Sequence, residues 1–317
     1  MGFLLDRAKS IYCFTNTLPS IHTGYSKTGM SVQKTFLFSI DFEEFETLPS
    51  QENFRQTPLP TLAKLLLDFL KKSQMVTTFF VVGKVARAYP DIISAIFDAG
   101  HELACHTDQH NTLNTLDPSK FRVDLEHNRA ALLSAAPRAV VTGFRAPLLS
   151  LTPQTSWAYN ILADLGFAYS SSVLPASNPL FGWPGFGTTP RQINGIWEVP
   201  ITLGSGWRRS LPFAAGTYFR CLPMRWILKE FERSEKIASP IVGYFHPYDA
   251  DIHQQYVLHK EMVRTPYLNP LLYWGRKQTI PRLRMLVEIG FVFDRYDHHF
   301  KKTRTYARTE GNERAFL

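Results

Sequence analysis

The sequence contains two histidines, His106 and His110, that are four residues apart. In a helical turn this spacing places both imidazoles on one face, which suits a single divalent metal ion. A carboxylate such as Glu43 would complete a ligand set that leaves coordination sites open for water and substrate, as a catalytic metal requires. The alternative interpretation of an isolated pair is two ordinary turn histidines.

Acidic residues follow an apolar run in the segment Asp41-Phe42-Glu43-Glu44. One carboxylate could ligate the metal while its neighbour accepts the proton of the attacking water, and a basic partner such as Arg145 would keep that base ionised and oriented. His246, which follows Tyr244-Phe245, could be the general acid that protonates the leaving amine. The alternatives are a solvated acidic loop and a histidine satisfied in the core.

These polar residues need a scaffold that brings them together, and the hydrophobic pattern predicts one. Short apolar runs alternate with segments of helical spacing, which is typical of an α/β fold with a parallel sheet. Each candidate residue comes directly after a predicted strand, where the loops of such a sheet converge on one crevice. Strands are predicted at 35–40, 76–82, 102–105, 140–144, 167–171, 241–245 and 291–293, and helices at 60–72, 84–99, 118–134, 153–165, 224–235 and 281–289.

The composition is that of a globular protein, with 44% hydrophobic and 20% charged residues in 317. The net charge of +8 suits a polyanionic or phosphate-bearing partner, but the basic residues form no long run, so we predict no nucleic-acid partner. The three cysteines, Cys13, Cys105 and Cys221, show no CxxC spacing, and no stretch reaches the roughly 18 apolar residues of a membrane helix. We therefore expect a cytoplasmic protein without a transmembrane segment.

The chain is expected to form one large domain with extensions. Residues 1–33 lack periodicity and are predicted to be an N-terminal arm or upstream extension, and residues 301–317 a C-terminal tail. Residues 34–300 would be the catalytic domain. Its segment 174–211 is rich in Gly, Pro and Trp and is predicted to be a long functional loop.

Four motifs in order make the sequence recognisable. They are Asp41-Phe42-Glu43, His106-Thr107-Asp108-Gln109-His110, Gly143-Phe144-Arg145-Ala146-Pro147 and Phe245-His246-Pro247. Together they resemble the successive motifs of polysaccharide deacetylases, also known as the NodB-homology family or carbohydrate esterase family four. The resemblance covers about residues 35 to 295 and is weakest in the loop around Phe181 to Trp207.

The resemblance implies a deformed (β/α) barrel with about seven strands and hydrolysis of an acyl group on a sugar. By position, Asp41 would be the base, Arg145 the residue that orients it and His246 the acid. The metal ligands would be Glu43, His106 and His110. The ion would be Zn²⁺, with Co²⁺, Ni²⁺, Fe²⁺ and Mn²⁺ as alternatives.

Departures from the family pattern concern the substrate. In the first motif one residue separates Asp41 from Glu43, as in a subgroup that resembles deacetylases of exopolysaccharide or surface-glycan synthesis. Ser170-Ser171-Ser172 stands where many members have Asp-Ser-Ser. Leu148 stands where an aromatic residue is usual. We expect an aspartate's help to Arg145 or His246 to be missing. Four residues are predicted to contact substrate: Phe144, Pro147, Trp197 and Arg220.

The resulting hypothesis is a metal-dependent N-deacetylase that acts on an amino sugar, nucleotide-linked or lipid-linked, during surface-polysaccharide biosynthesis. Two alternatives stay open: a deformylase of N-formyl sugars, and a catalytically inactive glycan-binding module. A homo-oligomer is also left open by the sequence.

Overall fold

The computed structural model describes residues 34–51, 53–205, 211–236 and 240–300. The predicted arm at 1–33 and tail at 301–317 lie outside the described residues, so both remain predictions. Within the described part, no helix combines the length and the apolar character that a membrane crossing requires.

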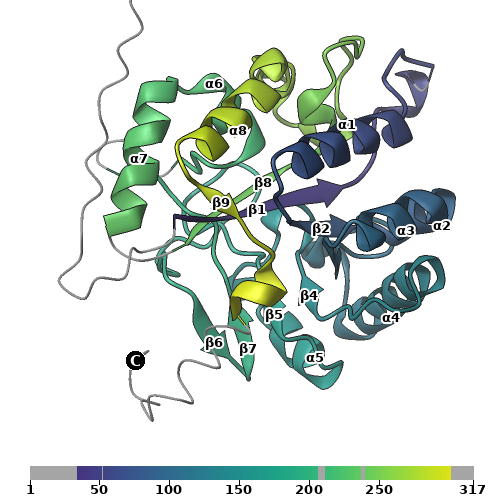
Figure 1. Cartoon of the computed structure of the whole chain (residues 1–317). Helices are drawn as coiled ribbons and strands as arrows, with labels where there is room; N and C mark the ends of the chain where they lie inside the picture. The colour runs from purple at the N-terminus through teal and green to yellow at the C-terminus, as the bar shows by residue number, and fades with distance from the viewer. Residues whose placement is uncertain (1–33, 52, 206–210, 237–239, 301–317) are drawn as a thin grey trace, which may run out of the picture. The chain divides into compact units, whose positions relative to one another are not determined.

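Strands and helices alternate along the chain as the hydrophobic pattern predicts (Figure 1). The strands are β1 (Thr35–Phe42), β2 (Thr78–Val81), β3 (Glu102–Cys105), β4 (Gly143–Phe144), β5 (Tyr169–Ser170), β6 (Arg191–Ile193), β7 (Ile196–Glu198), β8 (Ile241–Phe245) and β9 (Val292–Phe293). The α-helices are α1 (Leu59–Lys72), α2 (Gly83–Ala88), α3 (Pro90–Asp98), α4 (Pro118–Ala135), α5 (Ala158–Asp164), α6 (Gly216–Cys221), α7 (Met224–Lys236) and α8 (Thr279–Glu288). Short 3₁₀ helices include η3 (Pro147–Leu149), η6 (Pro247–Ala250), η7 (Lys260–Met262) and η8 (Pro266–Leu272).

Local chemistry explains where the helices begin and end. The side chain of Asp117 accepts a hydrogen bond from the Lys120 backbone N–H at 2.9 Å and caps α4, whose first residue is Pro118. The predicted helix 84–99 is instead two helices, α2 and α3, separated at Tyr89. Pro90 causes the break, because proline lacks an N–H and excludes the preceding residue from helical geometry.

The strands form one sheet in the order β6-β7-β5-β4-β3-β2-β1-β8, with β9 paired to the start of β1. All pairs are parallel except β6 with β7. Side chains alternate along β1, which pairs with β2, β8 and β9. Phe36, Phe38, Ile40 and Phe42 belong to the large core beneath the helices, whereas Leu37 belongs to a second core on the opposite face.

The α/β prediction is confirmed, with differences in detail. The described residues form nine strands rather than about seven, because the predicted loop 174–211 contains the hairpin β6-β7. The described strands do not close into a barrel by strand pairing. The two ends of the sheet nevertheless approach each other at Thr202, whose N–H donates to the Val242 carbonyl at 3.1 Å and whose hydroxyl accepts from the Val242 N–H at 2.8 Å.

Candidate active site

Parallel strands carry the predicted catalytic residues to one edge of the sheet. Asp41 and Glu43 lie at the end of β1, His106 follows β3 and His246 follows β8. Together with His110, they line one cavity of about 250 Å³. The convergence expected from the sequence therefore occurs in the structure.

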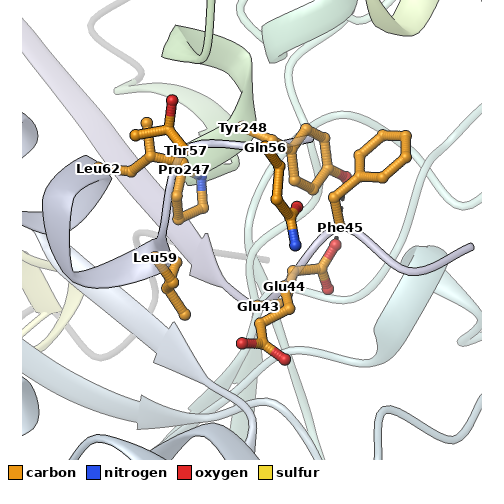
Figure 2. Close-up of a pocket in the computed structure, with 9 residues that line it drawn as sticks. All are labelled: Glu43, Glu44, Phe45, Gln56, Thr57, Leu59, Leu62, Pro247 and Tyr248. Carbon is orange, nitrogen blue, oxygen red and sulfur yellow. Dashed lines mark hydrogen bonds between the residues drawn. The ribbon is translucent and has the colours of Figure 1, made fainter. Parts of the chain in front are cut away.

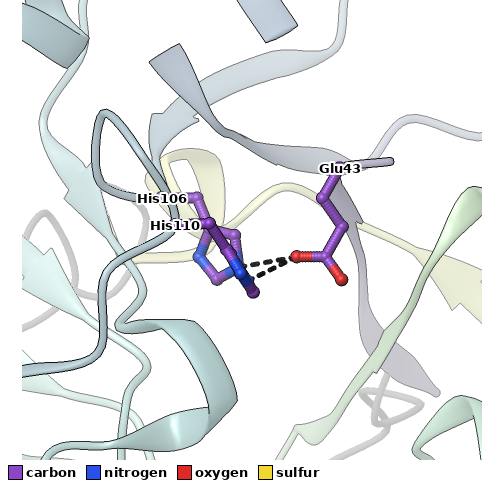
Figure 3. A group of neighbouring side chains, drawn as sticks. All are labelled: Glu43, His106 and His110. Carbon is purple, nitrogen blue, oxygen red and sulfur yellow. Dashed lines mark ion pairs between the residues drawn. The ribbon is translucent and has the colours of Figure 1, made fainter. Parts of the chain in front are cut away.

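Glu43, His106 and His110 form a compact buried cluster (Figure 3). One ligand atom from each lies within 4.8 Å of the others. Glu43 Oε2 is 2.6 Å from His110 Nε2 and 3.7 Å from His106 Nε2, so all three side chains point at the same spot. Two imidazoles and one carboxylate are a donor set suited to Zn²⁺ and to several other divalent ions.

The hydrogen bonds around this cluster fit a cation. His106 Nδ1 lies 2.8 Å from the Arg145 carbonyl, which can only accept, so Nδ1 carries the proton and Nε2 presents a lone pair to the cluster. His110 Nδ1 lies 3.5 Å from Glu261 Oε1. In many metal sites a carboxylate contacts the second ring nitrogen of a ligating histidine in this way. Glu43 Oε2 is buried, and its nearest polar neighbours are the two histidine rings of the cluster. The residues present therefore fit a divalent metal.

Electrostatics supports the same conclusion. Burial alone would raise the pKa of Glu43, but the positive charge of His110 and the nearby rings of His106 and His246 hold that pKa well below its usual value. Burial alone would lower the pKa of His110, yet the Glu43 carboxylate raises it to about 9. Without a metal, a proton on His110 balances the Glu43 charge, and a bound cation would displace this proton.

Arg145 holds Asp41 in place. The guanidinium is fully buried, and its Nη1 donates to Asp41 Oδ1 at 2.7 Å and to the Ser39 hydroxyl at 2.7 Å. The guanidinium also lies over the ring of Phe80, with its carbon atom 4.0 Å from the ring centroid. This arrangement fixes a charged carboxylate at the floor of the cavity, where Asp41 is only 4% exposed.

The sequence did not reveal two further partners of Arg145, Ser171 and Tyr296. Arg145 Nη2 donates to the Ser171 hydroxyl at 3.0 Å and to the Tyr296 hydroxyl at 2.9 Å, and Nε donates to the Ser171 carbonyl at 2.9 Å. All five N–H donors of the guanidinium are thus used. Ser171 and Tyr296 thus support Arg145, where we expected the help of an aspartate to be missing.

His246 is likewise supported by a carboxylate that the sequence analysis overlooked. Its Nδ1 lies 3.2 Å from Asp249 Oδ2, its backbone N–H donates to the same oxygen at 2.7 Å, and Tyr248 stacks on its ring at 4.5 Å. Burial would lower the pKa of His246, but the hydrogen bond to Asp249 and the charge of Glu43 raise it. Asp249 Oδ1 is in turn 2.7 Å from Nη2 of Arg220.

None of the four residues predicted to contact substrate lines the cavity, and their role in substrate binding stays a prediction. Phe144 is buried against Phe121 and Phe167, and Pro147 is buried at the start of η3. Trp197 is half-buried on β7, where it stacks on Phe300. Arg220 is 2% exposed, because its guanidinium bonds Asp249 and the carbonyls of Gly216 and Trp274. The basic and aromatic character of Arg220 and Trp197 predicted sugar or phosphate contacts, and in the structure these two side chains make supporting and packing contacts.

A second pocket lies beside the same acidic segment (Figure 2). It is lined by Glu43, Glu44, Phe45, Pro247 and Tyr248, among others. Its volume is about 20 Å³, which accommodates about one water molecule and no substrate group. The cavity that contains Glu43, His106 and His110 together with Asp41 and His246 is therefore the candidate active site.

Comparison with known proteins relates the chain to two family models. Residues 51–170 match the model described as Polysaccharide deacetylase, and residues 171–303 match one described as a domain of unknown function (DUF3473). A chitooligosaccharide deacetylase of Sinorhizobium fredii is 37% identical over 95 residues, 30% of this chain and 44% of the relative. One from a Bradyrhizobium species is 32% identical over 94 residues, 30% of this chain and 43% of the relative. The matched region spans less than half the length of these curated relatives.

Solved structures with a similar course of the chain include a wild-type CE4 family pseudoenzyme from Bacillus anthracis and a family 4 carbohydrate esterase from Streptomyces lividans in complex with acetate. The first has a TM-score of 0.47 at 15% identity and covers 84% of this chain and 65% of its own. The second has a TM-score of 0.44 at 15% identity, with coverage of 82% and 91%.

Proposed function

We propose, from the premise that residues 51–170 belong to the polysaccharide deacetylase family, that this chain is a metal-dependent hydrolase that removes an N-acetyl group from an amino sugar. One observation carries the proposal. A single cavity is lined by the metal-fitting cluster of Glu43, His106 and His110, by Asp41 held by Arg145, and by His246 held by Asp249.

Each residue has a distinct role in amide hydrolysis. Asp41, as a carboxylate, accepts a proton from the water that attacks the acyl carbon. His246, whose pKa is raised by its hydrogen bond to Asp249, donates a proton to the nitrogen as the C–N bond breaks, which gives a carboxylic acid and a free amine. A divalent ion held by the cluster would supply Lewis-acid polarisation of the acyl oxygen and activation of water.

The finer proposal concerns ion, substrate and setting. Zn²⁺ is the proposed ion, since two imidazoles and a carboxylate with open coordination sites are its usual catalytic set. The proposed substrate is an acetylated amino sugar that is nucleotide-linked or lipid-linked and belongs to surface-polysaccharide biosynthesis in the cytoplasm. The net charge of +8 supports a phosphate-bearing substrate.

Deformylation of an N-formyl sugar is the enzymatic alternative, because the same groups would serve it. An inactive glycan-binding module is the alternative from another class. The network argues against inactivity. Arg145 is buried with all of its donors directed at Asp41 and its surroundings, an arrangement whose desolvation cost a binding module has no reason to keep.

The test combines metal analysis with activity. We expect about one divalent ion per chain in the purified protein. The ion should be lost in His106→Ala and His110→Ala and retained in His127→Ala, which removes an exposed histidine from α4. Released acetate or formate from acetylated and formylated amino sugars should follow metal content. A protein that binds no added Zn²⁺, Co²⁺ or Ni²⁺ would refute the proposal.

A further inference from the structure

Much of the catalytic cavity is aliphatic. Beside the catalytic groups, its wall includes Leu148 and Leu149 of η3, Leu268 and Leu271 of η8, and Leu180. Leucine side chains offer no hydrogen-bonding groups to the hydroxyls of a sugar. This wall points to a ligand that also carries a hydrocarbon part.

Several polar side chains of the cavity already make hydrogen bonds within the protein. The Thr217 hydroxyl accepts from Arg220 Nη2 at 3.2 Å, and His259 Nδ1 accepts from the Glu261 N–H at 3.3 Å. The Asn178 side-chain oxygen accepts from the Leu180 N–H at 2.9 Å, which leaves its NH₂ group. Together with Tyr218 and Tyr244, they give the cavity a polar part beside its aliphatic wall.

The leucines of η3 are held in a costly conformation. Leu148 and Leu149 both have φ of 55°, in the left-handed region that bulky residues avoid. Both side chains line the cavity, and Leu149 is only 4% exposed. Such strain persists only where surrounding structure imposes it, and it concentrates at functional sites.

The aliphatic wall continues out of the cavity along η8. Residues three apart in a 3₁₀ helix lie on one face, so Leu268 and Leu271 share a face of η8, and Trp274 follows just after the helix ends. Leu268 and Leu271 line the cavity, Leu271 is 41% exposed and Trp274 is 70% exposed. We call Leu148, Leu149, Leu268, Leu271 and Trp274 the apolar strip. It leads from beside the metal-fitting cluster to the surface.

Buried arginines fix this strip in place. Arg220 donates to the Trp274 carbonyl at 2.6 Å, and Arg276 donates to the Leu272 carbonyl at 2.8 Å. Hydrogen bonds from two buried guanidinium groups thus hold the backbone of this exposed apolar segment in place. A wall ordered before the ligand arrives loses less entropy on binding.

Exposed cations flank the outer part of the strip in the sequence. Arg264 precedes Leu268 by four residues, and Lys277 follows Trp274 by three. Neither forms an ion pair with any residue in the described part of the chain. Phosphate is the anion that such basic side chains bind.

We infer that the substrate is an amino sugar joined through phosphate to a long aliphatic chain, and that the apolar strip binds this chain. The inference rests on the proposed function and chooses the lipid-linked substrate over the nucleotide-linked one. The alternative source of the same chemistry is a long acyl group on the sugar nitrogen, and the experiment separates the two.

The experiment compares esters of N-acetylglucosamine 1-phosphate that carry a methyl or a decyl group, below the micellar concentration, with acetate release as the readout. Each buried methylene is worth about fourfold in kcat/KM, so the decyl ester should be at least about tenfold better. Leu271→Ser and Trp274→Ser should reduce this preference. Val140→Ser, a matched change of a 72% exposed residue ahead of β4, should keep it.

Several outcomes would overturn the inference. Equal kcat/KM for both esters, or a decyl preference that survives in Leu271→Ser and Trp274→Ser, would show that the strip binds no chain. A preference for N-hexanoyl over N-acetyl on the methyl ester, without a decyl preference, would assign the strip to the acyl group. Binding to phosphatidylcholine vesicles through Trp274, again without a decyl preference, would make it a membrane-docking surface. Failure of every ester to release acid while metal is bound would instead refute the proposed function.

Discussion

The two halves of the described chain contribute to the active site in different ways. Residues 34–170 supply Asp41, Glu43, His106, His110 and Arg145, all within three short motifs near strand ends. Residues 171–300 supply His246 and most of the groups that hold the others in place: Ser171, Arg220, Asp249, Glu261 and Tyr296. In the proposed mechanism the first half supplies the base and the metal-fitting cluster, and the second half supplies the acid and most of the groups that orient these residues.

This division explains why a region described only as a domain of unknown function follows the deacetylase match. It is part of the same sheet, since β5 pairs with β7 and β8 pairs with β1. Its side chains reach Arg145, His246 and His110. We therefore expect substitutions in the first half to abolish the reaction, and those in the second half to weaken it.

The largest effect should come from the base. Asp41→Asn keeps the shape of the side chain and a partner for Arg145 but removes the proton acceptor, so kcat should fall by about 10³-fold. Metal content should be unchanged, because Asp41 lies outside the cluster of Glu43, His106 and His110. Metal analysis and kcat on the same preparation test this. Near-normal kcat in the metal-loaded variant would remove Asp41 from the mechanism.

A smaller effect should follow from the carboxylate behind a metal ligand. Glu261→Gln takes the negative charge away from His110 Nδ1, 3.5 Å distant, and such outer partners typically contribute at least about tenfold to metal affinity. Competition with a chelating dye would measure the Kd for Zn²⁺. Glu44→Gln is the matched control, because Glu44 is an exposed neighbour outside the cluster. Unchanged affinity in Glu261→Gln would reduce Glu261 to a pocket-lining residue.

The sequence predicted the motif residues of the first half better than the supporting residues of the second half. Strand ends, the histidine pair and Arg145 were accessible because their spacing and order are local signals. Tyr296 was not, because its contact to Arg145 joins residues 151 positions apart. Asp249 had a local signal, a carboxylate three residues after His246 that caps η6, and the Asn194-Gly195 turn between β6 and β7 is a strong hairpin signal inside the predicted loop.

The orientation of Arg145 can be weakened without removing any reacting group. Tyr296→Phe deletes one of two acceptors of Arg145 Nη2 and leaves the Ser171 hydroxyl, so kcat should fall by about tenfold with little change in KM. Tyr169→Phe is the control. It removes a hydroxyl from the same buried cluster that bonds Glu102 rather than Arg145, so it should lower the thermal midpoint without lowering kcat. Equal kcat losses in both variants would indicate a general packing effect.

The smallest effect on kcat, a loss of a few-fold at neutral pH, should come from Asp249→Asn. Asp249 raises the pKa of His246, and a general acid works only while protonated, so activity is lost as pH rises through that pKa. Without the carboxylate charge the pKa falls, and the alkaline limb of the kcat profile should move to lower pH, while the loss at acidic pH stays small. Arg220 makes the comparison sharper, because Arg220→Met leaves the buried Asp249 charge unpaired and should destabilise the fold. An alkaline limb that does not move in a folded Asp249→Asn variant would show that His246 is not the acid.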